Sequence, residues 1–356
     1  MAENFAGLAD LVSWFKKSKR PFPWRGSPGN SISPYAVWVS EVMLQQTRAE
    51  VVIPYFQSWM KQFPDITSLA QASEDEVIKA WEGLGYYARP RRLLRAAQYL
   101  MAHHSGNIPS SPDLLAKIPG FGPYTVGAVA SFAFHQKAAA VDGNVMRFLS
   151  RYLLIRDDIG TPSVQEEFRR RTMELLPNRE PWVVMEAMIE LGAVICKRQP
   201  LCTICPVRTA CRAFGEGIAA ELPRKSPAKA TIRLTRKAVV LKCGEKVLVG
   251  QVPLGQVMAG LFEFPIFEGE QVDVYHELGV CLNEKPCLLG SLDIIRYVFT
   301  HYQVTLQPTL WEVDKNIEWP GYKWVALGDL RQLPFSSGHR RLCEQILRYF
   351  DEMEKM

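Results

Sequence analysis

Apolar residues follow two different periods along this chain, and the change falls near residue 223. Before that point they recur with the three- and four-residue spacing of an α-helix, and stretches rich in Gly, Pro and Ser interrupt them. The helical segments expected from this pattern are residues 8–17, 37–63, 74–84, 91–104, 112–118, 125–134, 164–176 and 182–196. We therefore expect residues 1–222 to form an all-α domain.

Beyond residue 232 apolar and polar residues alternate, which is typical of β-strands with one buried face. Residues 236–252 predict a hairpin that turns at Gly244 and Glu245. Further elements are expected as strands within 293–313 and 322–327, and as a closing helix over 337–350. The pattern predicts a smaller α/β domain over residues 232–356. The expected fold class is therefore multi-domain, all-α followed by α/β.

Residues 223–231 join the two predicted domains and differ from both. No acidic residue occurs between Glu221 and Glu245, whereas seven Lys and Arg residues do. Together with Pro223 and Pro227, this stretch predicts a basic interdomain linker. Its cations either contact phosphates or are simply solvated.

Composition sets limits on the class of protein. The 356 residues suffice for two domains at a soft average of roughly 150 residues each. No apolar run approaches the roughly 18 residues that span a membrane, and the N-terminus lacks the basic start and apolar core of a secretory signal. We therefore expect a cytoplasmic protein of bacterial type with no membrane partner. The formal charge of +5 is compatible with a nucleic-acid partner.

Four of the eight cysteines are clustered, with the spacing C-x5-C-x2-C-x5-C. In the cytosol, where disulfides are rare, such a cluster predicts a metal site, and the spacing leaves zinc and an iron–sulfur centre both open. The expected ligands are Cys196, Cys202, Cys205 and Cys211, a module spanning residues 196–211. The other four cysteines are scattered through the second domain and are interpreted as packing residues.

Two short motifs bear on function: one suggests a contact with DNA, and the other suggests a chemical role. Gly120 and Gly122 lie between two helical stretches, where glycines permit a tight turn and close backbone approach. The helix that follows starts with unpaired N–H groups that can bind a phosphate. Further on, Asp142 stands where a helix is expected to begin, and Asp is a favoured N-cap. A helix start also keeps a carboxylate ionised.

Together these features resemble a known family. The stretches PFPWR (21–25), VWVSEVMLQQTR (37–48), WEGLGYYARPRRL (81–93), PGFGPYTVGAV (119–129), VDGNVMR (141–147) and EAMIELGAVIC (186–196) carry the resemblance. They are similar to the MutY-type adenine DNA glycosylases of the endonuclease III, or helix–hairpin–helix, superfamily. The resemblance implies a two-lobed helical glycosylase domain with a [4Fe–4S] module over residues 1–222, followed by a Nudix-like lesion-recognition domain.

The resemblance also implies the reaction and its catalytic residues. Members hydrolyse the N-glycosidic bond of adenine mispaired with 8-oxoguanine or guanine, a step in base excision repair. Glycoside chemistry uses one carboxylic acid and one carboxylate, and the matching positions are Glu41 as the acid and Asp142 as the stabiliser of the sugar cation. Tyr124 and Asn144 match positions that assist at the sugar and the catalytic water. Because bifunctional members have Lys where Tyr124 stands, we expect a monofunctional enzyme with little or no lyase activity.

Other positions match residues that handle the bases and the strands. Trp24, Arg25 and Glu186 correspond to the lining of the adenine pocket, and Gln46 and Tyr86 to the wedge that enters the base stack. Thr47 corresponds to a contact with the 8-oxoguanine strand. Phe299, Thr300 and His301 correspond to the loop that senses 8-oxoguanine, and Gly120 and Gly122 to the hairpin that holds the DNA backbone. The expected partner is double-stranded DNA with A:8-oxoguanine or A:G mispairs, bound by a monomer.

The sequence departs from the family pattern at three places. The first two cluster cysteines are separated by five residues rather than six, the loop at 26–33 is longer, and Thr300 replaces a serine. A magnesium-dependent nucleotide hydrolase needs a helix crowded with glutamates, and residues 260–280 do not supply one. Two alternatives remain, a bifunctional glycosylase for oxidised pyrimidines and a non-catalytic DNA-binding scaffold. Tyr124 argues against the first and the pair Glu41 and Asp142 against the second.

Overall fold

The computed structural model describes residues 5–25, 33–227, 230–253, 255–282 and 286–353. By its internal contacts the chain divides into two units. The helical unit comprises Met1–Gln71 and Arg92–Pro227, and the sheet unit comprises Ala72–Arg91 and Ala228–Met356. Within the described residues, no helix has both the length and the apolar character needed to cross a membrane.

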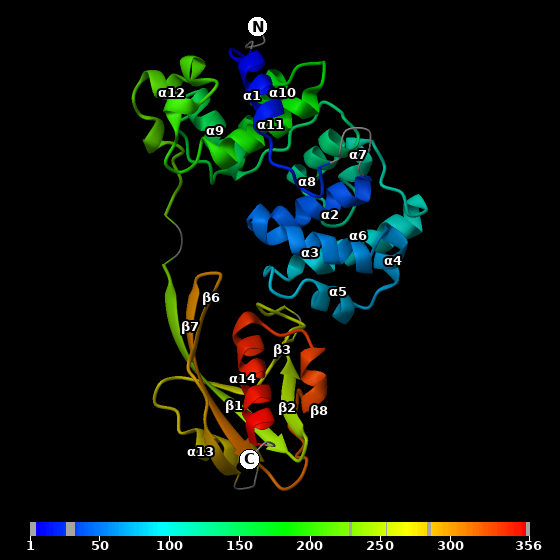
Figure 1. The fold of residues 1–356 in the computed structure, drawn as a ribbon, viewed down its shortest axis with the longest axis vertical. Helices are drawn as coiled ribbons and strands as arrows, with labels where there is room; N and C mark the ends of the chain where they lie inside the picture. The colour runs from blue at the N-terminus through cyan, green and yellow to red at the C-terminus, as the bar shows by residue number, and fades with distance from the viewer. Residues whose placement is uncertain (1–4, 26–32, 228–229, 254, 283–285, 354–356) are drawn as a thin grey trace. The chain divides into compact units, whose positions relative to one another are not determined.

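The N-terminal two-thirds of the chain is built from helices (Figure 1). The α-helices are α1 (Leu8–Ser18), α2 (Pro34–Leu44), α3 (Ala49–Gln62), α4 (Ile66–Gln71), α5 (Glu74–Ala80), α6 (Ala88–His104), α7 (Pro112–Leu115), α8 (Pro123–Ala128), α9 (Gly143–Tyr152), α10 (Pro162–Leu175), α11 (Pro181–Val194) and α12 (Arg212–Gly215). A π-helical turn, Val129–Ala133, continues α8, and short 3-10 turns occupy Cys202–Ile204, Arg208–Ala210 and Ala219–Glu221. The predicted all-α part is confirmed.

One predicted helix is broken in two. The single segment expected at 37–63 forms α2 and α3, because the chain turns between them at Gln46, whose φ is 60°. A non-glycine residue in this left-handed region cannot continue a right-handed helix. The turn leaves Gln46 exposed at the surface.

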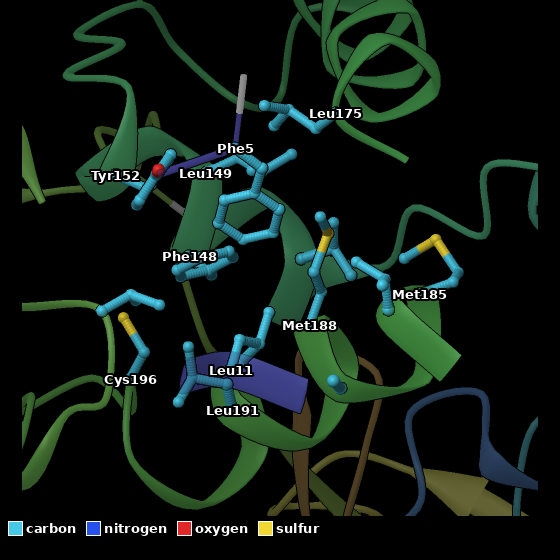
Figure 2. Close-up of a cluster of buried hydrophobic side chains, with 14 of the residues drawn as sticks. Phe5, Leu11, Phe148, Leu149, Tyr152, Leu175, Met185, Met188, Leu191 and Cys196 are labelled. Carbon is cyan, nitrogen blue, oxygen red and sulfur yellow. The ribbon is translucent and has the colours of Figure 1, made fainter. Parts of the chain in front are cut away.

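The core of the helical unit packs α1, α9 and α11 together (Figure 2). Phe5 stacks edge-on against Tyr152 at 5.1 Å, and Leu11, Met188 and Leu191 are fully buried beside them. Burial of side chains of this size contributes about 1.5–3 kcal/mol each. The same cluster includes Cys196, so helix α9, which begins beside Asp142, and the start of the cysteine module share one packed interior.

Among its described residues, the sheet unit contains eight paired strands. They are β1 (Ile232–Cys243), β2 (Lys246–Gln251), β3 (Phe262–Glu263), β4 (Ile266–Glu268), β5 (Cys287–Ser291), β6 (Ile295–Phe299), β7 (Tyr302–Glu312) and β8 (Tyr322–Ala326), with helices α13 (Val274–Leu282) and α14 (Ser337–Met353) and the 3-10 turn Leu327–Arg331. The strand order is β3-β2-β1-β7-β5, with β4 on β1, β6 on β7 and β8 on β2. The predicted hairpin β1–β2 is confirmed, and Cys243 pairs with Lys246 across its turn.

Strand alternation explains how the sheet is covered on both faces. Ala238 and Val240 of β1 lie in the apolar cluster that contains the buried side of α14. Val239 and Leu241, which point to the opposite face, lie in the cluster that contains α13. Helix α13 was not predicted, because its short sequence lacks a clear helical stripe. The parallel pairing of β1 with β7, from Ile232 with Tyr302 to Lys242 with Glu312, was not predicted either.

The division into units differs from the predicted domains at two places. Residues 72–91 group with the C-terminal part, because Glu82 of this segment binds Arg340 at 2.6 Å and Lys79 donates to the carbonyl of Arg331 at 2.7 Å. The predicted linker 223–231 is not free along its described part. Ile159 donates to the carbonyl of Arg224, and the backbone N–H of Ser226 donates to Asp158, so these residues pack onto the helical unit. Residues 228 and 229 lie outside the described residues.

Candidate active site

Glu41 lies in α2, a helix that is largely buried. Ser33 caps α2 by accepting from the Ala36 N–H, Pro34 occupies the first turn, and nine of the following residues are buried. Glu41 is 8% exposed. Burial among apolar neighbours disfavours the ionised form and raises the pKa of Glu41 to about 7. The predicted proton donor therefore has a pKa near neutrality, as general acid catalysis requires.

Tyr124, on the first turn of α8, faces Glu41. Its hydroxyl donates to Glu41 Oε2 at 2.5 Å, and burial raises the pKa of Tyr124 well above its ordinary value. The tyrosine therefore stays a donor, which lowers the pKa of Glu41 and partly offsets the effect of burial. The hydrogen bond fixes one carboxyl oxygen and leaves the other to carry the acidic proton.

Asp142 is the N-cap of α9, as the sequence predicted. Its Oδ1 accepts from the backbone N–H groups of Asn144 at 2.9 Å and Val145 at 2.8 Å. The helix start favours the ionised carboxylate, but burial has the larger effect and raises the pKa of Asp142. The hydrogen bonds from Val145 and Asn144, and the charge of Arg147, act in the opposite direction. Asp142 and Glu41 are close enough for the charge of Asp142 to raise the pKa of Glu41.

A chain of hydrogen bonds runs from Asp142 toward the cysteine module. Asn144 Nδ2 donates to Asp142 Oδ2 at 2.7 Å, and Arg147 donates to Asn144 Oδ1 at 2.8 Å. Arg147 Nε donates in turn to the carbonyl of Cys196 at 2.7 Å. The close packing that this requires depends on Gly192 of α11, where a Cβ would meet the carbonyl of Asn144 at 2.6 Å. Sequence analysis missed Arg147 and Gly192, although both fall inside the quoted motifs.

Arg25 lies between two acidic residues on α11. Its Nε pairs with Glu186 Oε1 at 2.5 Å and one terminal nitrogen with Glu190 Oε2 at 2.8 Å. Arg25 and Glu186 also influence Glu41, whose pKa the arginine lowers and the glutamate raises. Trp24 is 7% exposed and stacks on Phe22 at 4.9 Å. The structure thus groups Arg25, Glu186 and Glu41, whereas Trp24 is a packed aromatic beside them. Most of the longer loop at 26–33 lies outside the described residues.

The four clustered cysteines lie in one small region of the helical unit. Cys196 is buried and the other three cysteines are partly exposed. The pKa of the Cys205 thiol is raised to about 11, mainly by burial and further by the nearby Cys196, Cys202 and Cys211. Arg151, 2% exposed, donates to Cys196 Sγ at 3.2 Å and to the carbonyls of residues 197, 198 and 222. In the described part of the chain, no three His, Cys, Asp or Glu side chains are already arranged around a metal position.

The remaining predicted contacts lie on exposed turns of both units. In the helical unit, Gln46 has a positive φ and Thr47 follows it. In the sheet unit, Tyr86 is 52% exposed with φ 51°, and Thr300 has φ 48° in the turn between β6 and β7. A β-branched residue in this region is a real outlier, of the kind found at functional sites. Phe299 packs on Tyr302 at 5.2 Å and His301 on the same ring at 4.2 Å.

Comparison with known proteins identifies the family. A model described as "HhH-GPD superfamily base excision DNA repair protein" matches residues 39–176, and a model of the NUDIX domain matches residues 237–345. Adenine DNA glycosylase of Mus musculus is 33% identical over 386 residues, covering 92% of this chain and 75% of the mouse protein. The Rattus norvegicus enzyme is 31% identical, covering 99% and 79%. The chain belongs to the adenine DNA glycosylase family.

Solved structures agree on the helical fold of this adenine DNA glycosylase. A thermostable thymine-DNA glycosylase aligns with a TM-score of 0.52 at 22% identity, covering 59% of this chain and 95% of that one. A trapped endonuclease III–DNA covalent intermediate aligns with a TM-score of 0.51 at 23% identity, covering 59% and 95%. The family assignment establishes a DNA glycosylase of base excision repair that acts on adenine, and it sets aside the scaffold and the pyrimidine-specific enzyme.

The glycine turn of the glycosylase differs in detail from the prediction. Gly120 has φ 85°, and a Cβ there would meet Arg92 at 3.0 Å, so this position requires glycine. Gly122 is the N-cap of α8 with φ −84°, and nothing lies within 4 Å of where its Cβ would be. Its lack of a side chain therefore serves no internal packing, which suits the approach of an outside group.

We expect the double change Gly120→Ala and Gly122→Ala to weaken DNA binding about tenfold or more, because the turn would be strained and its outer face covered. Fluorescence anisotropy with a duplex would measure this. Gly122→Ala alone separates the two causes, since it leaves the turn unstrained. Unchanged affinity of the double variant would refute the hairpin assignment.

Proposed function

We propose that this adenine DNA glycosylase removes adenine opposite 8-oxoguanine or guanine by hydrolysis, without lyase activity. The observation that carries the proposal is the pairing of Glu41, whose pKa is about 7, with the Tyr124 hydroxyl at 2.5 Å and with Asp142 at the start of α9. One group can hold a proton at neutral pH, and the other is a carboxyl oriented by three hydrogen bonds from Asn144 and Val145.

The mechanism follows from these roles. The adenine leaves the base stack, since the enzyme cannot reach its glycosidic bond inside the duplex. Glu41 donates its proton to a ring nitrogen of adenine, and the bond electrons leave with the neutral base. The sugar becomes an oxocarbenium-like cation that Asp142 stabilises. Water then adds to it, and the proton that the water loses returns to the Glu41 carboxylate. Tyr124 cannot form a Schiff base with the sugar as a lysine would, so the backbone remains uncut.

The other matched residues have proposed roles around this centre. Arg25 and Glu186 hold the extruded adenine, with Glu186 accepting from its amino group, and Trp24 supports them. Gln46, Thr47 and Tyr86 contact the stack and the opposite strand. Phe299, Thr300 and His301 sense 8-oxoguanine, whose N7–H is a donor that guanine lacks. The exposed positive-φ turns at Gln46, Tyr86 and Thr300 support these roles, and a monomer suffices for all of them.

We propose that the residues Cys196, Cys202, Cys205 and Cys211 hold a [4Fe–4S] cluster. Their thiols lie close enough to influence one another's ionisation, and the buried Arg151 guanidinium beside Cys196 suits an anionic thiolate. The cluster would cross-link the loop between residues 196 and 211. We expect about four iron atoms per chain by metal analysis, with loss of iron in Cys202→Ser and retention in Cys243→Ser, a matched change outside the module. Zinc in place of iron would refute the assignment.

Strand scission after hot alkali tests the proposed substrate. Single-turnover reactions would use duplexes with adenine opposite 8-oxoguanine, guanine or thymine, each with and without alkali. We expect scission of the first two duplexes only after alkali, and none with thymine. Scission without alkali would refute the hydrolytic mechanism, and equal scission of all three would refute the proposed selectivity.

A further inference from the structure

Glu190 is a buried acidic residue of the helical unit that the proposed mechanism does not use. Its side chain is 1% exposed, and a charged group this deep in a protein requires partners. Arg20 Nε donates to Glu190 Oε1 at 2.7 Å, and Arg25 donates to Glu190 Oε2 at 2.8 Å. Despite its burial, these two arginines hold the pKa of Glu190 below its ordinary value. Glu190 is therefore ionised at neutral pH.

The contacts of Arg25 connect this buried carboxylate to the candidate base pocket. Glu186 and Glu190 are four residues apart on α11 and so lie on the same face of the helix. The Arg25 guanidinium bridges them, at 2.5 Å from Glu186 and 2.8 Å from Glu190, and also donates to the carbonyl of Arg20 at 2.8 Å. Three acceptors thus fix one guanidinium. The more exposed Glu186, at 26%, is left facing outward while Glu190 stays inside.

The same four side chains are balanced in charge. Arg20 and Arg25 carry two positive charges, and Glu186 and Glu190 carry two negative charges. Both guanidiniums also lie over the ring of Phe22, at 4.8 and 5.0 Å, which keeps them side by side. Arg20 has a second acidic partner, Glu50, but that side chain is 67% exposed, so water screens its charge. Glu190 is the buried counter-charge of the arginine pair.

We propose that Glu190 is a positioning residue for base excision, which holds Arg25 against Glu186 and balances the charge of the arginine pair near Glu41. The inference rests on the proposed role of Arg25 and Glu186 at the adenine. Glu190 itself contacts no reacting atom in this scheme. It acts through Arg25.

The charge balance predicts the direction in which the pKa of Glu41 changes when one of these charges is removed. The groups that act on Glu41 are Tyr124 from α8, Asp142 at the start of α9, Glu186 from α11 and Arg25. Removing the charge of Glu190 leaves an excess positive charge on the arginine pair, which favours ionised Glu41. The alkaline limb of the pH–rate profile then moves to lower pH. Removing the charge of Arg20 has the opposite sign and moves the limb to higher pH.

The test is the pH dependence of the single-turnover rate for four variants. For Glu190→Gln we expect a rate about ten- to hundredfold lower, because small misplacements of a positioning group cost this much. We also expect the alkaline limb of its pH–rate profile to lie about half a pH unit or more lower than in the wild type. Glu190→Asp should restore the wild-type limb. Arg20→Gln should move the alkaline limb to higher pH. Glu50→Gln, the matched change at an exposed carboxylate, should leave both the rate and the limb unchanged.

An unmoved limb in Glu190→Gln would overturn the proposal, even if the rate fell, because a purely structural role lowers the rate without shifting the profile. If Glu190→Gln does not fold, Arg20→Gln decides by the same criterion. The profile is measured on whichever adenine duplex the wild type cleaves. A wrong assignment of the opposite base would therefore appear in the wild type and leave the test of Glu190 intact.

Discussion

Glu41→Gln should bind mispaired DNA with wild-type affinity and release adenine about 10²–10⁴-fold more slowly, the usual contribution of a general acid. Glutamine has nearly the same shape and can still accept the Tyr124 hydrogen bond at its amide oxygen, so the fold around α2 is preserved. What it lacks is the transferable proton. Single-turnover excision and fluorescence anisotropy, measured on the same duplex, separate chemistry from binding.

The pH dependence of the excision rate is a second test of the role of Glu41. Burial raises the pKa of Glu41 to about 7, and the protonated form is the reactive one. The wild-type rate should therefore fall about tenfold for each pH unit above that pH. The limb should vanish in Glu41→Gln. Glu263→Gln is a matched control, because burial also raises the pKa of Glu263 but that residue lies in the sheet unit. A normal rate in Glu41→Gln would remove Glu41 from its role.

Asp142→Asn should reduce the excision rate about 10²–10³-fold, as expected for loss of one electrostatic stabiliser of the transition state. Asparagine caps helices as well as aspartate does, so the N–H groups of Asn144 and Val145 keep their acceptor and thermal unfolding should change little. Removing a negative charge that faces DNA should leave binding equal or tighter. A large fall in melting temperature would show that Asp142 acts as a cap and not at the sugar.

Sequence alone predicted the helical part, the two-stranded hairpin and the closing helix, because periodicity and turn residues are local signals. It also predicted the buried acid Glu41, since Val39, Val42, Met43 and Leu44 around it are apolar. The parallel pairing of β1 with β7 was out of reach, because the partners are about seventy residues apart and no local pattern encodes which strands pair.

The charge network around Arg25 was equally hidden. Glu190 stands four residues after Glu186 in a helix that otherwise is apolar, and that isolated acid was a usable signal. Its partners Arg20 and Arg25 come from 165 residues or more away, so nothing local pointed to them. The burial of Asp142 was hidden for a related reason. A cap is visible in sequence, whereas the burial that outweighs it arises from packing of distant segments.

The parallel pairing of β1 and β7 also decides what an interrupted chain would retain. Strand β1 is among the first elements of the sheet unit to leave the ribosome, and its long partner follows only with residues 302–312. A nonsense change before residue 302 would strip β1 of that partner and of the helix α14 that covers one face. Among the residues that the structure describes, the packed interior around Phe5, Phe148 and Leu191 uses none beyond 211, so it would be complete. Such a fragment would still possess Glu41, Tyr124 and Asp142 but not a finished sheet unit. Premature termination there should therefore spare the residues that cleave the bond and remove those that choose which adenine is cleaved.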